Sequence, residues 1–126
     1  MSEKFNFEIV RPDKKIFNEE VEEVTLPCYE GQLTILKDHI PLITFLRPGL
    51  IGINNKNKIF IEDGTVEFYK NNLLILSTSA TNLDSLDKIK IKDKILDAQE
   101  QLSKNELSDK QKYMLNHKID TLNLLN

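Results

Sequence analysis

The N-terminal part of the chain shows apolar residues at every second position, in short runs that turn-forming residues interrupt. Phe5, Phe7 and Ile9 form one such series. A period of two buries one face of a β-strand and leaves the other face to solvent. Residues 5 to about 79 are therefore predicted to form a small all-β unit.

Four polar segments separate the apolar runs and have the composition of tight turns, because they supply proline, glycine or asparagine. Asp63-Gly64 stands between two apolar runs and is the clearest signal for a two-residue hairpin. Leu73 to Leu76 does not alternate, which predicts a strand buried on both faces and hence two packed sheets. The predicted hairpins lie at Arg47-Pro48-Gly49, Asn54 to Asn57, Asp63-Gly64 and Lys70 to Asn72.

After Asp84 the apolar residues recur at steps of three and four, which is the period of an amphipathic helix. Ser103 to Leu107 separates the two stripes, and Ser108 with Gln111 has the form of a capping box that starts a helix. These features predict an antiparallel two-helix hairpin. The first stripe is Ile91, Ile95, Ala98 and Leu102, and the second is Leu115, Ile119, Leu122 and Leu125.

The change of period divides the chain into a β-sandwich domain, residues 1–84, and a helical hairpin domain, residues 85–126. The polar segment 78–84 between them is predicted to serve as a hinge. Burying one large aliphatic side chain contributes about 1.5 to 3 kcal/mol, whereas ordering one residue costs roughly 1 to 2 kcal/mol. The stripes hold too few such side chains to order the hairpin alone. We expect the hairpin to pack on the sandwich or on a partner.

Composition excludes several classes of function. The formal net charge of the 126 residues is -3, and no basic stripe interleaved with aromatic residues appears, which argues against nucleic-acid binding. Cys28 is the single cysteine, so an intramolecular disulfide is excluded and a packing role is expected. The N-terminus has no apolar signal-peptide core, and no apolar run of membrane-spanning length occurs. Any association with a membrane is expected to be indirect, through a partner.

The residues that usually carry catalysis are sparse and isolated. The two histidines, His39 and His117, stand in no metalloprotease or nucleophile motif, and no phosphate-binding glycine loop occurs. His39 is expected at a turn before a strand. His117 is expected on the polar side of the second helix, either solvated or in contact within the hairpin. The acidic run from Glu19 to Glu23 is expected to be a solvated strand face rather than a metal site. No catalytic or metal-binding residue is therefore assigned.

An ordered set of residues through the β unit resembles the epsilon subunit of bacterial F-type ATP synthases. It runs from Val24 to Ala80 and departs from the family pattern at Lys37-Asp38, where the family commonly has Pro-Gly. The central part of the set is Glu30-Gly31-x-Leu33, Ile35, His39-x-Pro41-Leu42, Leu46 and Arg47-Pro48-Gly49. The resemblance implies a sandwich of about ten strands that binds the gamma subunit and rests on the membrane c-ring, followed by a regulatory hairpin.

Such a subunit would be a non-catalytic part of the rotor, coupling gamma to the c-ring during proton-driven ATP synthesis. It would lie peripherally at the cytoplasmic face of the bacterial inner membrane, with further contacts of the hairpin to the alpha and beta subunits. Polar loop tips can hold a protein in register on a partner through hydrogen bonds. The residues that the resemblance places against the c-ring are Glu30, Gly31, Gln32, Lys37, Asp38 and His39.

The start of the hairpin corresponds to the segment through which some bacterial members bind ATP, by an Ile/Leu-Asp-x-x-Arg-Ala motif. Within Leu86 to Ile91, Asp87 stands at the aspartate position and Lys90 at the arginine position. Lysine has the charge but not the bidentate fork of arginine. The resemblance thus makes Asp87 and Lys90 candidate nucleotide-binding residues, while no cofactor is required.

A second interpretation of the same pattern is a stand-alone β-sandwich binding module that dimerises through its helical hairpin. That module would pair two copies through the apolar face formed by Ile91, Ile95 and Leu102. A small hydrolase is a third class, but it needs a nucleophile, a base and an orienting group that the sequence does not display. Binding to gamma would distinguish the rotor subunit from the dimerising module.

Overall fold

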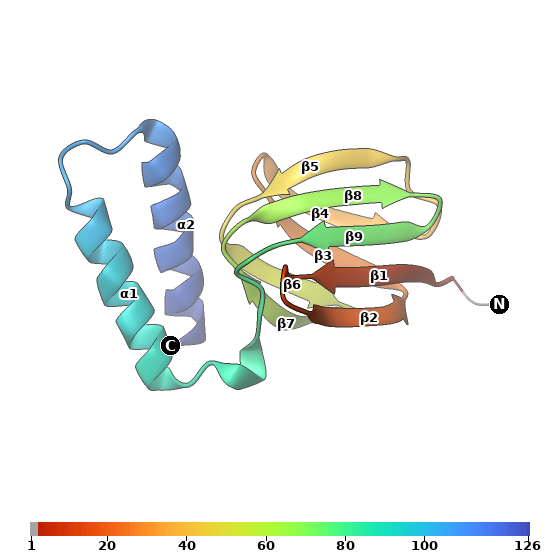
Figure 1. Ribbon diagram of the computed structural model, residues 1–126, viewed down its shortest axis with the longest axis horizontal. Coiled ribbons are helices and arrows are strands. Elements are labelled where there is room, and N and C mark those ends of the chain that lie inside the picture. The colour runs from red at the N-terminus through yellow and green to blue at the C-terminus, as the bar shows by residue number, and fades with distance from the viewer. Residues whose placement is uncertain (1–2) are drawn as a thin grey trace.

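The computed structural model describes residues 3–126 and shows a ten-stranded β-structure followed by two helices (Figure 1). The strands are β1 (Phe5–Val10), β2 (Lys15–Val21), β3 (Glu23–Cys28), β4 (Gly31–Leu36), β5 (Leu42–Leu46), β6 (Gly49–Ile53), β7 (Lys56–Ile61), β8 (Gly64–Tyr69), β9 (Asn72–Leu76) and β10 (Thr81–Asn82). A short 3-10 turn, η1 (Leu83–Ser85), leads into α1 (Lys88–Leu102) and α2 (Asp109–Leu125).

The strands form two layers that share β3. Their order is β10-β7-β6-β3-β5-β8-β9-β1-β2, and β4 pairs with β3 outside this path. Near its start β3 pairs with β6, through Val24 and Thr25, whereas at its end Cys28 pairs with Leu46 of β5. One strand thus passes from one layer to the other. The predicted sandwich with a C-terminal helical hairpin is confirmed.

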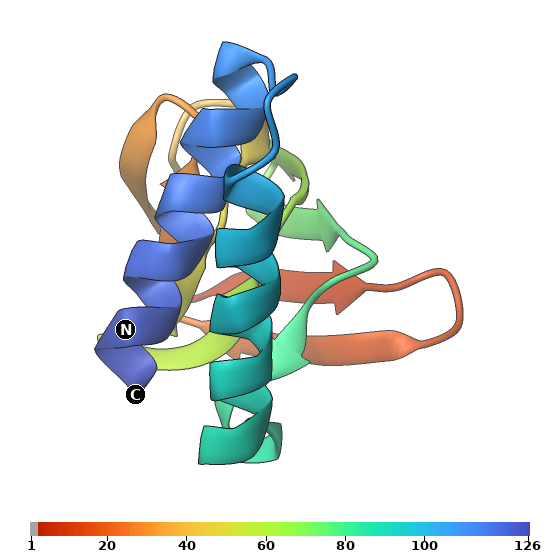
Figure 2. The same cartoon turned by 90° about the vertical axis from the view of Figure 1, so that its left-hand side faces the viewer.

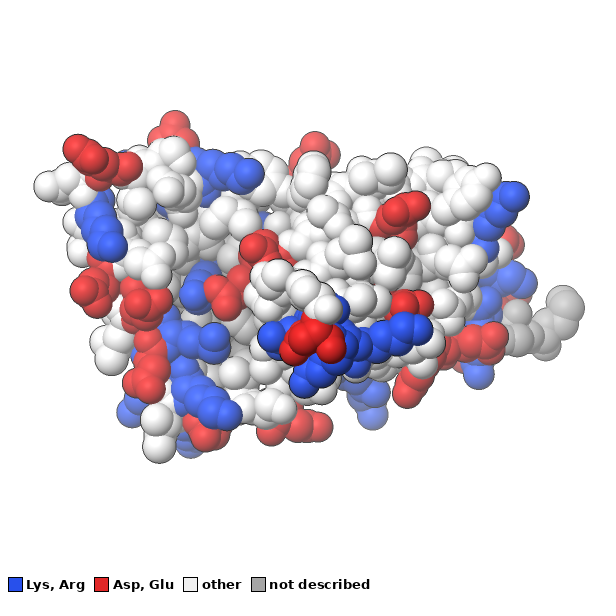
Figure 3. All heavy atoms as spheres, in the orientation of Figure 1, with Lys and Arg blue, Asp and Glu red and all other residues white. Residues whose placement is uncertain are grey.

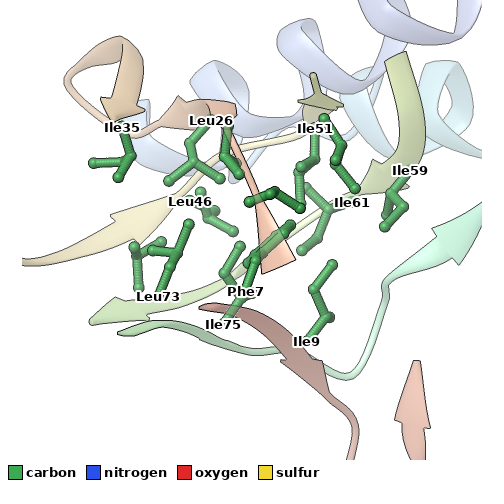
Figure 4. Close-up of a cluster of buried hydrophobic side chains, with 14 of the residues drawn as sticks. Phe7, Ile9, Leu26, Ile35, Leu46, Ile51, Ile59, Ile61, Leu73 and Ile75 are labelled. Carbon is green, nitrogen blue, oxygen red and sulfur yellow. The ribbon is translucent and has the colours of Figure 1, made fainter. Parts of the chain in front are cut away.

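The core lies between the two layers and consists of aliphatic and aromatic side chains from both (Figure 4). The alternating residues of β1 supply Phe7 and Ile9, which are fully buried. Phe5 meets Phe68 edge to face, with ring centroids 5.7 Å apart. This close packing lets the sandwich act as a stiff body, because a core at crystal-like density deforms little under load.

Two of the four predicted hairpins are present. Asn54 and Asn55 connect β6 to β7 with φ of 50° and 70°, and Lys70 and Asn71 connect β8 to β9 with φ of 47° and 61°. Positive φ at both central residues gives the twist that suits a two-residue hairpin, and asparagine tolerates it well. Local turn chemistry therefore predicted these two connections correctly.

The other two predicted hairpins are wrong. Asp63-Gly64 joins β7 to β8, but β7 pairs with β6 and β10 whereas β8 pairs with β5 and β9. Arg47-Pro48-Gly49 likewise joins β5 to β6, which do not pair with each other. Both segments carry the chain between layers. Gly64 is needed there, because its φ is +156° and an added Cβ would lie 2.8 Å from the Leu76 carbonyl oxygen.

The prediction that Leu73 to Leu76 is buried on both faces is also wrong. Leu73 and Ile75 point into the core with 1% and 0% exposure, but Leu76 is 50% exposed. The strand β9 alternates like its neighbours, and apolar residues occupy its outer face as well. No layer within residues 3–126 covers the outer face of β9.

The helices begin at the predicted positions. Asp87 caps α1 by accepting a hydrogen bond from the main-chain nitrogen of Lys90 at 2.8 Å. The capping box of Ser108 and Gln111 is present in both directions, at 2.8 Å and 3.1 Å. The two helices lie side by side across one end of the sandwich (Figure 2). The antiparallel hairpin is thus confirmed.

The hairpin packs on the sandwich, as its small apolar stripes led us to expect. Phe60 of β7 is fully buried in a second cluster, separate from the main core, with Ile91 and Ile95 of α1 and Leu122 of α2. The face that the dimerising module would use is therefore occupied inside the molecule. This observation argues against the second interpretation of the sequence.

Polar contacts reinforce this docking. The Glu62 carboxylate at the end of β7 lies 2.6 Å from the ammonium group of Lys118 on α2 and 3.7 Å from that of Lys94 on α1. One carboxylate of the sandwich thus joins both helices. In the predicted hinge, the Ser79 hydroxyl accepts hydrogen bonds from the main-chain nitrogens of Glu62 and Asp63 at 3.0 and 3.2 Å. The polar linker is bonded to the sandwich before the helices begin.

Candidate functional site

The outer face of β5, β8 and β9 carries exposed apolar side chains. Ile43 is 77% exposed, Phe45 63%, Tyr69 54% and Leu76 50%. Phe45 and Leu76 lie in the same row across the sheet, because both pair with Thr65. Figure 3 shows few charged groups over these strands. We refer to Ile43, Phe45, Tyr69 and Leu76 as the apolar face.

Sequence reasoning missed the apolar face, although a signal was present. The segment from Leu42 to Leu46 has apolar residues at both parities, so one strand face had to remain apolar after the core was filled. Only the sheet order shows that β5, β8 and β9 are neighbours and that their outer residues combine. Large apolar side chains gathered on one exposed sheet face mark a candidate interaction site.

The apolar face is hollowed at both ends. One hollow of about 360 Å³ is lined by Pro41, Ile43 and Tyr69. The other is larger, about 750 Å³, and lies between the sandwich and the start of α2, with Tyr29, Phe45 and Met114 among its lining residues. A partner that covers the face could place side chains into both hollows.

The first group of predicted ring-contact residues lies at the turn between β3 and β4. Glu30 and Gln32 are exposed, and Gly31 has a φ of +139°, a backbone conformation that favours glycine. This turn is close to the hairpin, because the Tyr113 hydroxyl of α2 donates to the Tyr29 carbonyl oxygen at 2.6 Å. The three residues form one polar corner.

The second predicted group lies at the other end of β4. Asp38 has a φ of 65° and exchanges two hydrogen bonds with Asn71 in the turn between β8 and β9, at 2.7 and 2.9 Å. The His39 ring lies edge-on to Phe68 with centroids 5.9 Å apart, and Lys37 is half-buried. His39 thus lies in the turn region before β5, where the sequence predicted it.

The structure does not bring these two groups together. Each lies at one end of the six-residue strand β4, and six residues of β-strand extend about 20 Å. However, β4 pairs with β3 alone and forms an edge of the sandwich. Gln32, Thr34 and Leu36 are exposed along β4. A flat partner lying along this edge could touch both corners at once.

His117 on α2 is partly buried and contacts a neighbouring side chain of the same helix. Its ring packs on Tyr113 with centroids 4.5 Å apart, and Tyr113 in turn packs on Tyr29 at 4.8 Å. Partial burial lowers the pKa of His117 below its usual value, the positive charge of Arg47 lowers it further, and Asp120 acts in the opposite direction. The aromatic stack joins α2 to the β3–β4 turn.

Cys28 lies buried at the end of β3, in agreement with the expected packing role. Burial raises the pKa of its thiol, nearby Arg47 opposes this, and Glu30 adds to it. The thiol is therefore kept in its unreactive, protonated form. Glu19 and Glu20 are exposed on β2, which confirms that this acidic run lies on a solvated strand.

Within residues 3–126 no three His, Cys, Asp or Glu side chains are placed to hold a metal ion. Neither helix of the same segment combines the length and apolar character needed to cross a bilayer.

The candidate nucleotide-binding residues take part in the start of α1. The Asp87 carboxylate caps the helix, and the Lys90 ammonium group donates to the Ser85 carbonyl oxygen at 3.2 Å. Both side chains are exposed. A phosphate group could reach Lys90, but the Asp87 carboxylate is already engaged by the helix.

Comparison with known proteins identifies the β-sandwich. Residues 4–83 match the family model of the ATP synthase delta/epsilon chain β-sandwich domain. The fold and this match define a delta/epsilon-type subunit of ATP synthase.

Individual relatives identify the type of subunit within this class. The ATP synthase epsilon chain of Pelagibacter ubique is 44% identical over 130 aligned positions that cover all of both chains. The ATP synthase epsilon chain 2 of Nitrobacter hamburgensis is 33% identical, over 84% of this chain and 80% of the relative. The chain therefore belongs to the ATP synthase epsilon chain family.

Solved structures agree on the fold. A chain in the Euglena gracilis mitochondrial ATP synthase, solved as OSCP/F1/c-ring, matches with a TM-score of 0.77 at 20% identity, covering 98% of this chain and 82% of that one. A chain of the Tetrahymena thermophila mitochondrial ATP synthase central stalk and c-ring matches with a TM-score of 0.59 at 15% identity, covering 95% and 92%. At these identities the likeness concerns architecture alone.

Proposed function

We propose that this chain is a non-catalytic rotor subunit of an F-type ATP synthase, whose sandwich joins the gamma subunit to the c-ring. Its membership of the epsilon chain family supports this proposal. The observation that carries the mechanism is the apolar face on an otherwise well-packed sandwich. Nucleotide chemistry takes place in other chains, and this subunit transmits torque as a stiff adaptor.

Gamma is the partner that we assign to the apolar face. Ile43, Phe45, Tyr69 and Leu76 would lose water contact on binding, and each fully buried large apolar side chain contributes about 1.5 to 3 kcal/mol. The hollows at the two ends supply shape for specific side chains of the partner. A contact that must hold during rotation needs such an apolar centre.

The c-ring is the partner that we assign to the β4 edge. Glu30, Gly31 and Gln32 would touch it at one end of the strand, and Lys37, Asp38 and His39 at the other. Two separated polar contacts fix the orientation of the subunit better than one, because they resist rotation about a single point. The solved assemblies that contain chains of the same fold are an OSCP/F1/c-ring complex and a central stalk with its c-ring, which supports this assignment.

The hairpin is proposed as a regulatory element that can leave the sandwich and contact the alpha and beta subunits. We place the domain division between residues 84 and 85, and the apolar cluster between hairpin and sandwich, which is separate from the main core, supports it. For ATP binding through Asp87 and Lys90 we expect weak affinity, because Asp87 caps α1. Calorimetric titration with ATP tests this, and strong saturable heat that is lost in Asp87→Asn or Lys90→Gln would contradict it.

The location that we propose follows from the partners. A subunit bound to the c-ring lies peripherally on the membrane, at the cytoplasmic face of the inner membrane in a bacterium. The absence of a suitable spanning helix within residues 3–126 fits attachment through a partner. Protons are proposed as the coupling ion.

The experiment compares two substitutions at matched exposure. Phe45→Glu lies on the apolar face and Leu96→Glu lies on α1, and the parent side chains are 63% and 64% exposed. We expect Phe45→Glu to weaken binding of purified gamma at least about tenfold, the equivalent of roughly 1.4 kcal/mol, and Leu96→Glu to have little effect. Failure of the parent chain to bind gamma would refute the proposal, and equal effects of both variants would refute the assigned face.

A further inference from the structure

Arg47 lies where the sandwich meets the hairpin and is held firmly. Its main-chain nitrogen donates to the Pro27 carbonyl oxygen at 2.9 Å, and its Nη1 donates to the Pro48 carbonyl oxygen at 3.0 Å. The side chain passes over Gly49, where an added Cβ would lie 3.3 Å from Nη1 and 2.4 Å from Pro27. Glycine at this position therefore leaves room mainly for the Pro27 ring, and it also avoids a tight contact with the guanidinium group.

The charge of Arg47 is not balanced within the part of the chain that the structure describes. Its Nε is buried and has no hydrogen-bond partner there, and none of the ion pairs formed by those residues includes Arg47. The Nε of Arg11 is likewise buried without a hydrogen-bond partner, but Arg11 forms an ion pair, with Nε 3.5 Å from the Asp13 carboxylate. A partly buried guanidinium without an anionic partner is costly, unless a ligand supplies one.

Neutral donors surround a cavity beside Arg47. The cavity has a volume of about 210 Å³ and is lined by Gln32, Arg47 and Asn57 of the sandwich and by Thr121 of α2. Within residues 3–126 the side-chain amides of Gln32 and Asn57 form no hydrogen bond. Amide and hydroxyl groups can each donate to an oxyanion, and arginine binds phosphate through two parallel hydrogen bonds.

We propose that this cavity binds a small oxyanion, with a phosphate group as its ligand, through Arg47, Asn57 and Thr121. The group can come from inorganic phosphate or from a phosphorylated compound such as a nucleotide. Because the sandwich supplies Arg47 and Asn57 while α2 supplies Thr121, the bound anion links the two domains. Occupancy therefore stabilises the docked hairpin by mass action.

The test titrates inorganic phosphate into the full chain and follows main-chain amide resonances of the cavity by NMR, with sodium chloride at equal ionic strength as the control. We expect saturable shifts at residues 47, 57 and 121, and slower amide exchange in α2. Arg47→Gln should weaken binding about tenfold or more, because a hydrogen bond to a charged group contributes roughly 1.5 to 3 kcal/mol. Arg11→Gln is the matched control and should bind as the parent does.

A second variant covers the case in which Arg47→Gln does not fold. Thr121→Val keeps the size of a side chain that is 7% exposed and removes its hydroxyl, and it should also weaken binding. Titrations with ADP and ATP identify the source of the phosphate group, since a nucleotide that binds more tightly than phosphate and requires Arg47 supports the site equally. Shifts no larger than those caused by chloride, or unchanged affinity in both variants, would overturn the proposal. None of these measurements depends on gamma.

Discussion

The sandwich and the hairpin differ in whether each has an apolar core of its own. The sandwich closes a core of its own, in which Phe7, Ile9 and Leu26 are fully buried between two layers. The hairpin, in contrast, buries Ile91 and Ile95 in a cluster that includes Phe60 of β7, a residue of the sandwich. A body that must transmit load needs its own core, whereas an element that docks on another can be released from it. We therefore assign rigidity to the sandwich and regulation to the hairpin.

The largest loss of stability is expected from a substitution in the core of the sandwich. Phe7→Ala removes a fully buried ring and should lower the free energy of unfolding by about 3 to 5 kcal/mol. Because the hairpin depends on the sandwich, helix and strand signals should be lost in one transition. Urea denaturation followed by circular dichroism measures this. Helices that stay folded after the sandwich has unfolded would contradict the dependence of the hairpin on the sandwich.

Phe60→Ala removes a ring of the same type and burial from the cluster shared with the hairpin. The expected loss is again several kcal/mol, about 3 to 5 for a buried phenylalanine, but it should fall on the docking of the hairpin. Hydrogen exchange should quicken throughout α1 and α2 while the strands β1, β8 and β9 keep their protection. Equal loss of protection in both domains would show that they form one cooperative unit.

Glu62→Gln removes the carboxylate that joins Lys94 of α1 to Lys118 of α2. Since partly exposed ion pairs contribute about 0.2 to 1 kcal/mol each, the docked hairpin should weaken modestly and the effect should fade at high salt. Glu67→Gln is the control, because Glu67 is exposed and forms no ion pair within residues 3–126. Thermal unfolding at low and high salt compares the two. Identical shifts in both variants would exclude a specific role for Glu62.

The smallest expected effect is a change in how the free energy of unfolding depends on pH. The pKa of His117 is lowered in the folded protein, first by burial and then by Arg47. The unfolded chain therefore takes up a proton first, so the contribution of His117 is complete above about pH 6.5, the usual pKa of histidine, and is lost as the pH falls below it. His117→Gln should flatten this part of the stability profile. A parent profile that rises on acidification through this range would have the wrong sign.

Local features of the fold could be predicted from the sequence. The capping box of Ser108 and Gln111 involves residues three apart, and the hairpin at Asn54-Asn55 depends on backbone conformations that asparagine tolerates. Asp63-Gly64 has equally good turn chemistry but joins strands that belong to different layers. Turn residues determine a bend, whereas strand pairing depends on the whole sheet.

The candidate site shows the same limit. Glu30 and His39 were predicted as contact residues from the resemblance, but their positions at opposite ends of β4 follow only from the structure. The apolar character of Ile43 and Phe45 was visible in the sequence, yet their exposure depends on which layer covers them. The cavity beside Arg47 could not be predicted, because its walls come from both domains.

The central claim is that the sandwich alone carries the rotor contact and that the hairpin docks conditionally. Titration calorimetry of purified gamma with the full chain and with a chain truncated after Asp84 tests it most directly. We predict affinities within about threefold of each other, a difference below roughly 1 kcal/mol, with circular dichroism showing that the truncated sandwich is folded. A folded truncated chain that no longer binds gamma would contradict the claim.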